Sequence, residues 1–125
     1  MKLIHTENYE RMSQKGAELL LNTLRNKKDA VICLATGSSP EGMYEIVCEA
    51  VNRECIDLSQ VTFVKLDEWY GVKPDDACTC TTFLKKHLFE KLYMQPKEVI
   101  EFVSNAPDIQ QELEKMDMFL TEHPI

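Results

Sequence analysis

The sequence lacks long apolar runs, clusters of basic residues and any clear targeting segment. Its longest apolar stretches are far too short to cross a bilayer, and Met1 to His5 does not begin like a signal peptide. Acidic residues outnumber basic ones by 21 to 14, which gives a net charge of -7. No basic residues alternate with aromatic ones, as they do on many nucleic-acid-binding surfaces. We therefore expect a cytoplasmic protein that binds neither membranes nor nucleic acids.

Cysteine is present, but it forms no recognisable pairing pattern. The five cysteines are odd in number, include no C-x-x-C and mostly fall within apolar patterns, as reduced thiols of cytosolic proteins do. Cys78 and Cys80 are a possible metal or redox pair. No histidine or second cysteine pair lies at zinc spacing from them, so we expect plain loop and helix-start residues. The cysteine pattern therefore predicts no metal site.

A single α/β domain over residues 1–125 fits the length and the 44% hydrophobic content. No repeats, low-complexity segments or linkers interrupt it. Helical spacing of apolar residues predicts helices over residues 8–27, 40–54, 79–92 and from 109 onward. Runs rich in apolar and β-branched residues predict strands over residues 30–35, 61–66 and 99–103. This order predicts a three-layer α-β-α fold with a Rossmann-like, mainly parallel sheet.

Two of the helices carry specific packing predictions. The first, over residues 8–27, should cover one face of the sheet. The last should bury a single apolar stripe, formed by Ile109, Leu113, Met116 and Leu120.

The central stretch is an apolar strand followed by a turn of small residues. Residues 31–35 lack polar alternation, so we expect a parallel strand buried on both faces. The Thr-Gly-Ser-Ser sequence of residues 36–39 follows at the carboxyl end of this strand, with Ser39 as the expected cap and Pro40 as the first helical residue. A strand, a small-residue turn and a helix N terminus can form a phosphate site, but an ordinary turn has the same pattern. The stretch is neither a P-loop nor a dinucleotide fingerprint.

A second strand leads into two acidic residues, Asp67 and Glu68, which precede two aromatic residues and a glycine. Ligands of open parallel sheets bind beyond the carboxyl ends of the strands, so Asp67 and residues 36–39 should line one crevice. Because side chains alternate along a strand, one acid should point into the crevice and the other away from it. The alternative is that Asp67 caps a turn while Glu68 faces water.

Three segments together resemble the amino-terminal half of the hexosamine-6-phosphate deaminase/isomerase family. They are Ala-Thr-Gly-Ser-Ser-Pro (residues 35–40), Leu-Asp-Glu-Trp-Tyr-Gly (residues 66–71) and Asn-Ala-Pro-Asp (residues 105–108), in the order and spacing of that family. The family includes deaminases of glucosamine 6-phosphate and galactosamine 6-phosphate and is related to 6-phosphogluconolactonase. The Leu-Asp-Glu-Trp form, with Ser-Ser in the turn, resembles the galactosamine branch more closely.

The resemblance implies a small-molecule sugar phosphate as the partner and assigns roles to individual residues. The turn that holds the phosphate would consist of Thr36, Gly37, Ser38 and Ser39. Asp67 and Glu68 would be the catalytic residues, with Asp67 as the base that moves a proton between sugar carbons C1 and C2. The amine and carbonyl of the substrate would serve as the electron sink, so the resemblance implies no cofactor and no metal.

The sequence departs from the family in length. Family members are considerably longer, and their second half supplies ring-opening residues that have no match here. The chain ends at His123-Pro124-Ile125, before the next buried strand that a layered sheet needs, so we expect a truncated fold with little activity of its own. Exposed sheet edges and apolar faces would then favour a homo-oligomer.

Three functions remain open at this stage. The first is a deaminase/isomerase that converts a hexosamine 6-phosphate to a ketohexose 6-phosphate and ammonia. The second is another sugar-phosphate enzyme of the same fold, such as a 6-phosphogluconolactonase or a pentose-phosphate isomerase. The third is a non-catalytic sugar-phosphate-binding module or a structural half-domain.

Overall fold

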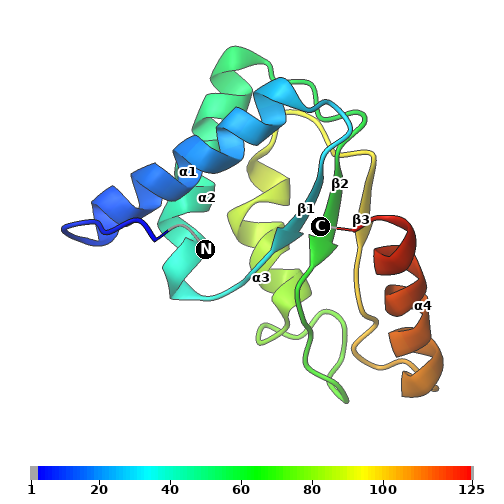
Figure 1. The fold of residues 1–125 in the computed structure, drawn as a ribbon. Helices are drawn as coiled ribbons and strands as arrows, with labels where there is room; N and C mark the ends of the chain where they lie inside the picture. Colours follow the sequence, from blue (N-terminus) through cyan, green and yellow to red (C-terminus); the bar gives the residue numbers. More distant parts are fainter. Residues whose placement is uncertain (1–2, 125) are drawn as a thin grey trace.

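Three parallel strands form the centre of the computed structural model, which describes residues 3–124. The sheet order is β1-β2-β3, and the strands are β1 (Val31–Leu34), β2 (Thr62–Lys65) and β3 (Glu98–Ile100). Val31 pairs with Thr62 and Leu34 with Lys65, so β1 and β2 end at the same edge of the sheet (Figure 1). The parallel order confirms the predicted α/β class. The predictions on residues 1–5 and 123–125 depend in part on Met1, Lys2 and Ile125, which lie outside the described residues.

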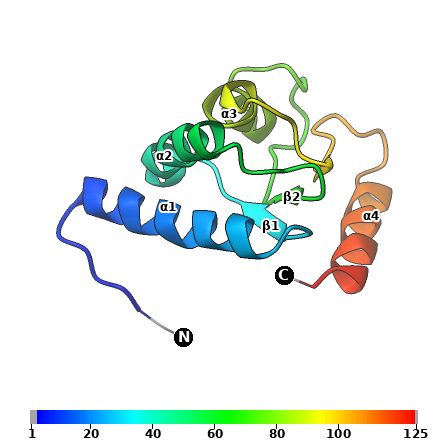
Figure 2. The same ribbon diagram turned by 90° about the horizontal axis from the view of Figure 1, so that it is seen from above.

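Helices cover both faces of this sheet. They are α1 (Tyr9–Asn26), α2 (Ser38–Glu54), α3 (Cys80–His87), the short 3₁₀ helix η1 (Phe89–Lys91) and α4 (Ile109–Glu122). Figure 2 shows α2 and α3 on one side of the strands and α4 on the other. The helix predicted over residues 79–92 is thus divided into α3 and η1 at Leu88, whose φ is -132°.

The main core lies between the sheet and helices α1, α2 and α3. Strand residues Leu34 and Phe63 face it together with Val47 and Val51 of α2 and Leu84 of α3. All of these side chains are at most 2% exposed. The alternation of side chains along the strands sends Cys33 and Val64 to the opposite face, where they line a cavity under α4.

Burial differs between the two strands that carry the motifs. All four residues of β2 are buried, as a central parallel strand requires. In β1 only Leu34 is buried, so the prediction that residues 31–35 are buried on both faces is wrong. The reason is that β1 lies at the edge of the sheet formed by the described residues.

Helix α1 packs mainly along α2, and the predictions for α1 and for the stripe of α4 need correction (Figures 1 and 2). The predicted cover of a sheet face by α1 holds only in part, because α1 reaches the core beside Leu34 only through side chains such as Leu21 and Leu24. In α4 only Met116 is buried, whereas Ile109 and Leu113 are 45% and 44% exposed. Ile109 and Leu113 line an open pocket at the end of the sheet, so the predicted stripe is buried only in part.

A glycine allows the close approach of α1 and α2. A Cβ on Gly42 would lie 2.8 Å from Ser13 Oγ and 3.0 Å from Tyr9 Cε1. The Tyr9 hydroxyl accepts a hydrogen bond from the Gly42 N–H at 2.9 Å and donates one to the Ser38 carbonyl at 2.7 Å. These contacts fix the start of α2 against α1.

Replacement of Gly42 by alanine is therefore expected to lower the free energy of unfolding by about 1 to 3 kcal/mol, although Gly→Ala in an open helix stabilises by about 1 kcal/mol. Gly16→Ala is the matched control. Its added Cβ would meet Met43 Sδ at 2.9 Å, which lies near the end of a flexible side chain that can move away. Urea denaturation of both variants measures the difference. Equal stability of the two variants would contradict this account of the helix interface.

Candidate functional site

The carboxyl ends of β1 and β2 bring the two main sequence motifs together. The Leu66 N–H donates to the Leu34 carbonyl at 3.0 Å, so pairing continues to the last residues of both strands. Residues 36–39 and Asp67 follow directly at this edge. The predicted meeting of the turn and the acid at one edge of the sheet is confirmed.

The turn at residues 36–39 is built around Gly37. Gly37 has φ +102°, a conformation that side chains disfavour, and nothing lies within 4 Å of a Cβ built on it. It occupies the N-cap position of α2, which has no side-chain cap. The Tyr44 hydroxyl donates to the Ala35 carbonyl at 2.6 Å and holds the entry to the turn.

The predicted helix start at Pro40, with Ser39 as its cap, is wrong, because α2 begins at Ser38. Pro40 is the third helical residue, and it fits there because the first N–H groups of a helix have no partner within the helix. The earlier start places the amides of Ser38 and Ser39 at the positive end of the α2 dipole. Both residues are exposed, so this end of α2 is open to an anion.

A thiol connects the turn to Asp67. The Thr36 hydroxyl donates to Cys80 Sγ at 3.3 Å, and Cys80 Sγ lies 3.9 Å from Asp67 Oδ1, within hydrogen-bond reach for sulfur. Cys80 is the first residue of α3 and is 6% exposed, whereas Asp67 is open to solvent. Burial and then the charge of Asp67 raise the pKa of the Cys33 thiol on β1, which places Asp67 beside the end of that strand as well.

Glu68 holds the N terminus of α3. Its side chain is only 2% exposed. Its carboxylate accepts hydrogen bonds from the N–H groups of Trp69, Cys80 and Thr81 at 2.8, 2.9 and 3.0 Å. Burial alone would raise the pKa of Glu68, but the ammonium of Lys65 and these N–H donors lower it to about 2. The alternative in which Glu68 faces water is wrong, whereas the division of the two acids, one into the crevice and one away from it, stays a prediction, because both line the pocket at the end of β2.

Lys65 is the buried counter-charge of Glu68. Its side chain is 1% exposed, and Nζ lies 2.7 Å from Glu68 Oε2 and 3.2 Å from Glu101 Oε2. The Thr81 hydroxyl also contacts Nζ. A buried ammonium requires such partners, because a charge without them is strongly unfavourable in the interior.

A mainly apolar pocket of about 270 Å³ opens beside Asp67, between the end of β2, the segment after β3 and α4. Trp69 and Tyr70, which are 64% and 57% exposed, line it together with Ile109 and Leu113. The Tyr70 hydroxyl donates to the Ala106 carbonyl at 3.3 Å. The Asn-Ala-Pro-Asp motif therefore lies against the segment that follows Asp67.

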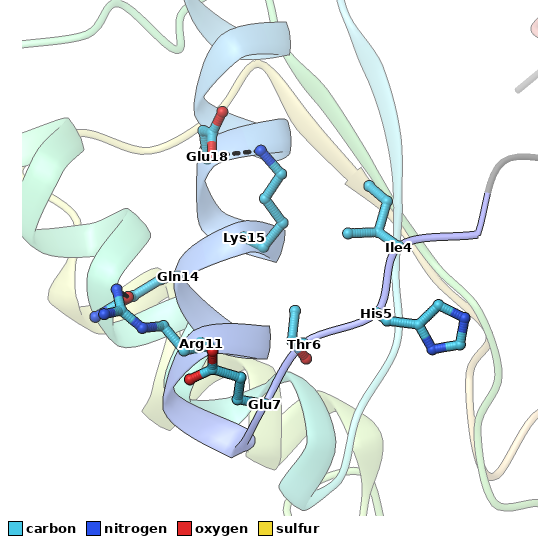
Figure 3. Close-up of a pocket in the computed structure, with 8 residues that line it drawn as sticks. All are labelled: Ile4, His5, Thr6, Glu7, Arg11, Gln14, Lys15 and Glu18. Atoms are coloured by element: carbon cyan, nitrogen blue, oxygen red, sulfur yellow. Dashed lines mark hydrogen bonds and ion pairs between the residues drawn. The ribbon is translucent and has the colours of Figure 1, made fainter.

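A larger pocket of about 470 Å³ lies far from these motifs in the sequence. Figure 3 shows it between residues 4–7 and α1, where Arg11, Gln14 and Lys15 line it. The ion pair between Lys15 and Glu18 crosses its wall at 2.8 Å. This pocket includes no residue of the three motifs, and its lining is a solvated helix surface.

Residues 3–124 contain neither a metal-binding cluster nor a membrane-spanning helix. No three histidine, cysteine, aspartate or glutamate side chains come together there in a group suited to hold a metal ion. In the same residues no helix combines the length and the apolar composition needed to cross a membrane. His87 stacks on Phe83 with ring centroids 4.4 Å apart, and its Nδ1 lies 3.3 Å from Glu41 Oε1.

The sequence analysis missed the roles of Lys65 and Cys80. Lys65 lies two residues after Phe63, so the period of a strand already placed it on the core face. Cys80 directly follows Thr79, which caps α3 by accepting from the Thr82 N–H at 3.1 Å. Only the contact of α3 with the two strand ends shows that the Cys80 thiol lies between Thr36 and Asp67.

Known proteins support the resemblance. The AgaI protein of Escherichia coli (strain K12) is 41% identical over 102 residues, which cover 82% of this chain and 41% of that protein. The glucosamine-6-phosphate deaminase of Thermoanaerobacter sp. (strain X514) is 36% identical over 117 residues, 94% of this chain and 46% of that protein. A solved structure of a monomeric glucosamine-6-phosphate deaminase of the NagB superfamily superimposes with a TM-score of 0.90 at 29% identity, covering 98% of this chain and 51% of that one. This chain thus spans about half of these relatives or less.

The family model confirms the assignment drawn from the three motifs. The model described as glucosamine-6-phosphate isomerases/6-phosphogluconolactonase matches residues 5–124. With nearly the whole chain matched, and with a relative at 36% identity over 94% of it, this chain belongs to the glucosamine-6-phosphate isomerase/6-phosphogluconolactonase family.

Proposed function

We propose that this protein is a deaminase/isomerase that converts a hexosamine 6-phosphate to a ketohexose 6-phosphate and ammonia. The observation that carries the proposal is the single thiol of Cys80, which contacts both Thr36 of the turn and Asp67. One small sugar phosphate can therefore reach the helix N terminus and the carboxylate together. The names of the deaminase relatives support this choice of reaction.

The phosphate is proposed to bind at Thr36, Gly37, Ser38 and Ser39. The N-terminal N–H groups of α2, the positive end of its dipole and the hydroxyl groups of the turn are donors suited to an anion. Local donors of this kind are needed because the whole chain carries a net charge of -7 and repels anions at long range.

Asp67 is proposed as the base. It is exposed at the strand end, so its carboxylate can take a proton from C2 of the open-chain aldose and return it to C1. The electron pair left at C2 is stabilised by the neighbouring carbonyl, whose oxygen takes a proton from the ammonium group of the substrate and becomes the C1 hydroxyl. Return of the first proton to C1 leaves a C=N bond at C2, which water hydrolyses to the ketone and ammonia. The Leu-Asp-Glu-Trp motif, with Ser-Ser in the turn, makes galactosamine 6-phosphate the first substrate to test.

The proposal is tested by measuring ammonia and ketohexose 6-phosphate formed from galactosamine 6-phosphate and glucosamine 6-phosphate. Asp67→Asn should lower turnover by about 10²- to 10⁴-fold and leave substrate affinity within a few-fold of wild type, because it removes the base and keeps the shape. Asp75→Asn, in an exposed loop, is the control. Equal turnover by wild type and Asp67→Asn would contradict the proposed role.

Gly37→Val should abolish hexose 6-phosphate binding in calorimetry, because a β-branched residue at φ +102° distorts the turn. Gly71→Val is the matched control, since Gly71 also has positive φ, +86°, and open space around it. It should bring similar strain and leave phosphate affinity unchanged. Equal loss of affinity in both variants would show that strain alone, and not the turn, is responsible.

Two other functions have distinct outcomes in the same assays. Binding that depends on Gly37 without any turnover would favour a non-catalytic sugar-phosphate-binding module. Hydrolysis of 6-phosphogluconolactone that is insensitive to Asp67→Asn would favour a lactonase. The solved lactonases support the fold alone; that of Thermotoga maritima has a TM-score of 0.72 at 20% identity.

Location and assembly are further parts of the proposal. We propose a cytoplasmic enzyme, in keeping with its free cysteines. A homo-oligomer is proposed because several large apolar side chains are exposed. Sedimentation of the purified protein tests this second point, and the solved deaminase relative is described as monomeric.

Glu68 is proposed to position the site by holding the N terminus of α3 against the end of β2. Glu68→Gln is expected to lower the free energy of unfolding at pH 7 by about 3 kcal/mol, because it leaves the Lys65 ammonium buried without its nearest counter-charge. The pKa of Glu68 is lowered from 4.5 to about 2. Its contribution is thus complete above pH 4.5 and is lost as the pH falls towards 2.

Glu101→Gln is the matched control, since Glu101 also contacts Lys65 but is 42% exposed. It should lower the free energy of unfolding by less than about 1 kcal/mol. Denaturation curves between pH 2 and pH 7 compare the variants. A Glu68→Gln variant that keeps the acid dependence of wild type would contradict the proposed role.

A further inference from the structure

We propose that Cys80 is a positioning residue that couples the phosphate-binding turn to the base, by accepting a hydrogen bond from Thr36 and donating one to Asp67. The proposal deepens the proposed function and rests on it. It names a residue of α3, an element outside the two strand-end motifs.

The geometry gives Cys80 both neighbours at once. Thr36 Oγ1 lies 3.3 Å from Sγ and Asp67 Oδ1 lies 3.9 Å from it. A thiol can accept one hydrogen bond and donate another, so in the series Thr36, Cys80, Asp67 each donor has an acceptor. The Thr36 hydroxyl hydrogen is directed to sulfur and the thiol hydrogen to the carboxylate.

The thiol keeps its proton in this setting. Burial is the largest influence and raises the pKa of the Cys80 thiol, whereas the hydrogen bond from Thr36 lowers it. The charges of Asp67 and Glu68 raise this pKa further and the charge of Lys65 lowers it, so that the pKa is raised as a whole. Sulfur therefore remains a donor to the carboxylate at neutral pH.

The position of the thiol is fixed by the backbone of α3. The Cys80 N–H donates to Glu68 Oε1 at 2.9 Å, and the next N–H, of Thr81, donates to Glu68 Oε2 at 3.0 Å. The side chain of Glu68 is 2% exposed and paired with Lys65 at 2.7 Å. The first turn of α3 thus has little freedom to move, and Sγ stays between the two strand ends.

Groups from three elements surround the Asp67 carboxylate. The Cys33 thiol of β1 is near enough for the Asp67 charge to raise its pKa, Cys80 contacts Asp67 from α3, and the ion pair of Glu68 with Lys65 lies at the end of β2. Of these groups, Cys80 contacts both Asp67 and the turn. Its removal should therefore affect both sites.

The test compares Cys80→Ala, which removes both hydrogen bonds, with Cys80→Ser, which keeps an acceptor and a donor. Cys48→Ala is the matched control for the loss of a buried thiol. Cys48 is 3% exposed in the core, and its Sγ contacts the Leu88 carbonyl at 3.6 Å.

The first readout needs no substrate. Amide hydrogen exchange at residues 36–39 should become several-fold faster in Cys80→Ala, and should stay near wild type in Cys80→Ser and Cys48→Ala. Equal exchange in Cys80→Ala and Cys48→Ala would overturn the proposal, because the thiol would then have only a packing role.

The second readout is the turnover of galactosamine 6-phosphate, with kcat and KM measured separately. Cys80→Ala should lower kcat several-fold, because the thiol no longer holds the base in position. Cys80→Ser should restore the wild-type kcat, and Cys48→Ala should keep it. An unchanged kcat in Cys80→Ala would overturn the link to the base. Absence of turnover in wild type would reject the proposed function, and the exchange experiment would still decide the role of Cys80.

Discussion

The parallel pairing of β1 with β2 is the constraint on which the rest of the site depends. The register joins Leu34 to Lys65, so both strands reach the same edge of the sheet together. The chain then leaves β1 through a glycine turn into α2 and leaves β2 through two acidic residues. Because parallel strands have their carboxyl ends at the same edge of the sheet, the strand arrangement alone brings residues distant in sequence together there.

The two acidic residues after β2 have opposite environments although they are neighbours in sequence. Asp67 stays open to solvent, as the proposed base requires. Glu68 is buried and receives N–H groups from the start of α3 together with the ammonium of Lys65. This ionised carboxylate acts at a helix N terminus, where the dipole favours negative charge. Glu68 therefore holds the start of α3 in place, and Asp67 remains accessible for the proposed proton transfer.

Much of this arrangement follows from local sequence rules. The apolar run at β1 and the β-branched run at β2 each depend on a few adjacent residues, and both strands lie where they were predicted. The convergence of residues 36–39 with Asp67 also follows, since it needs only the strand order. The start of α2 was misplaced because a positive φ at Gly37 allows the helix to begin earlier than Pro40 suggests.

The remaining features depend on packing between distant segments, which the spacing of residue types along the sequence does not predict. The packing of α1 on α2 depends on the space left at Gly42, and the partial exposure of the α4 stripe depends on the pocket that it borders. The contacts of Cys80 require α3 to be docked on the strand ends.

The most direct measurement of the central claim is a crystal structure of the protein with a bound hexosamine 6-phosphate. The account predicts the phosphate within hydrogen-bond distance of the N–H groups of residues 37–39, with C1 and C2 of the sugar beside the carboxylate of Asp67. A sugar phosphate bound in the pocket along α1, or bound at the turn with C1 and C2 directed away from Asp67, would contradict it.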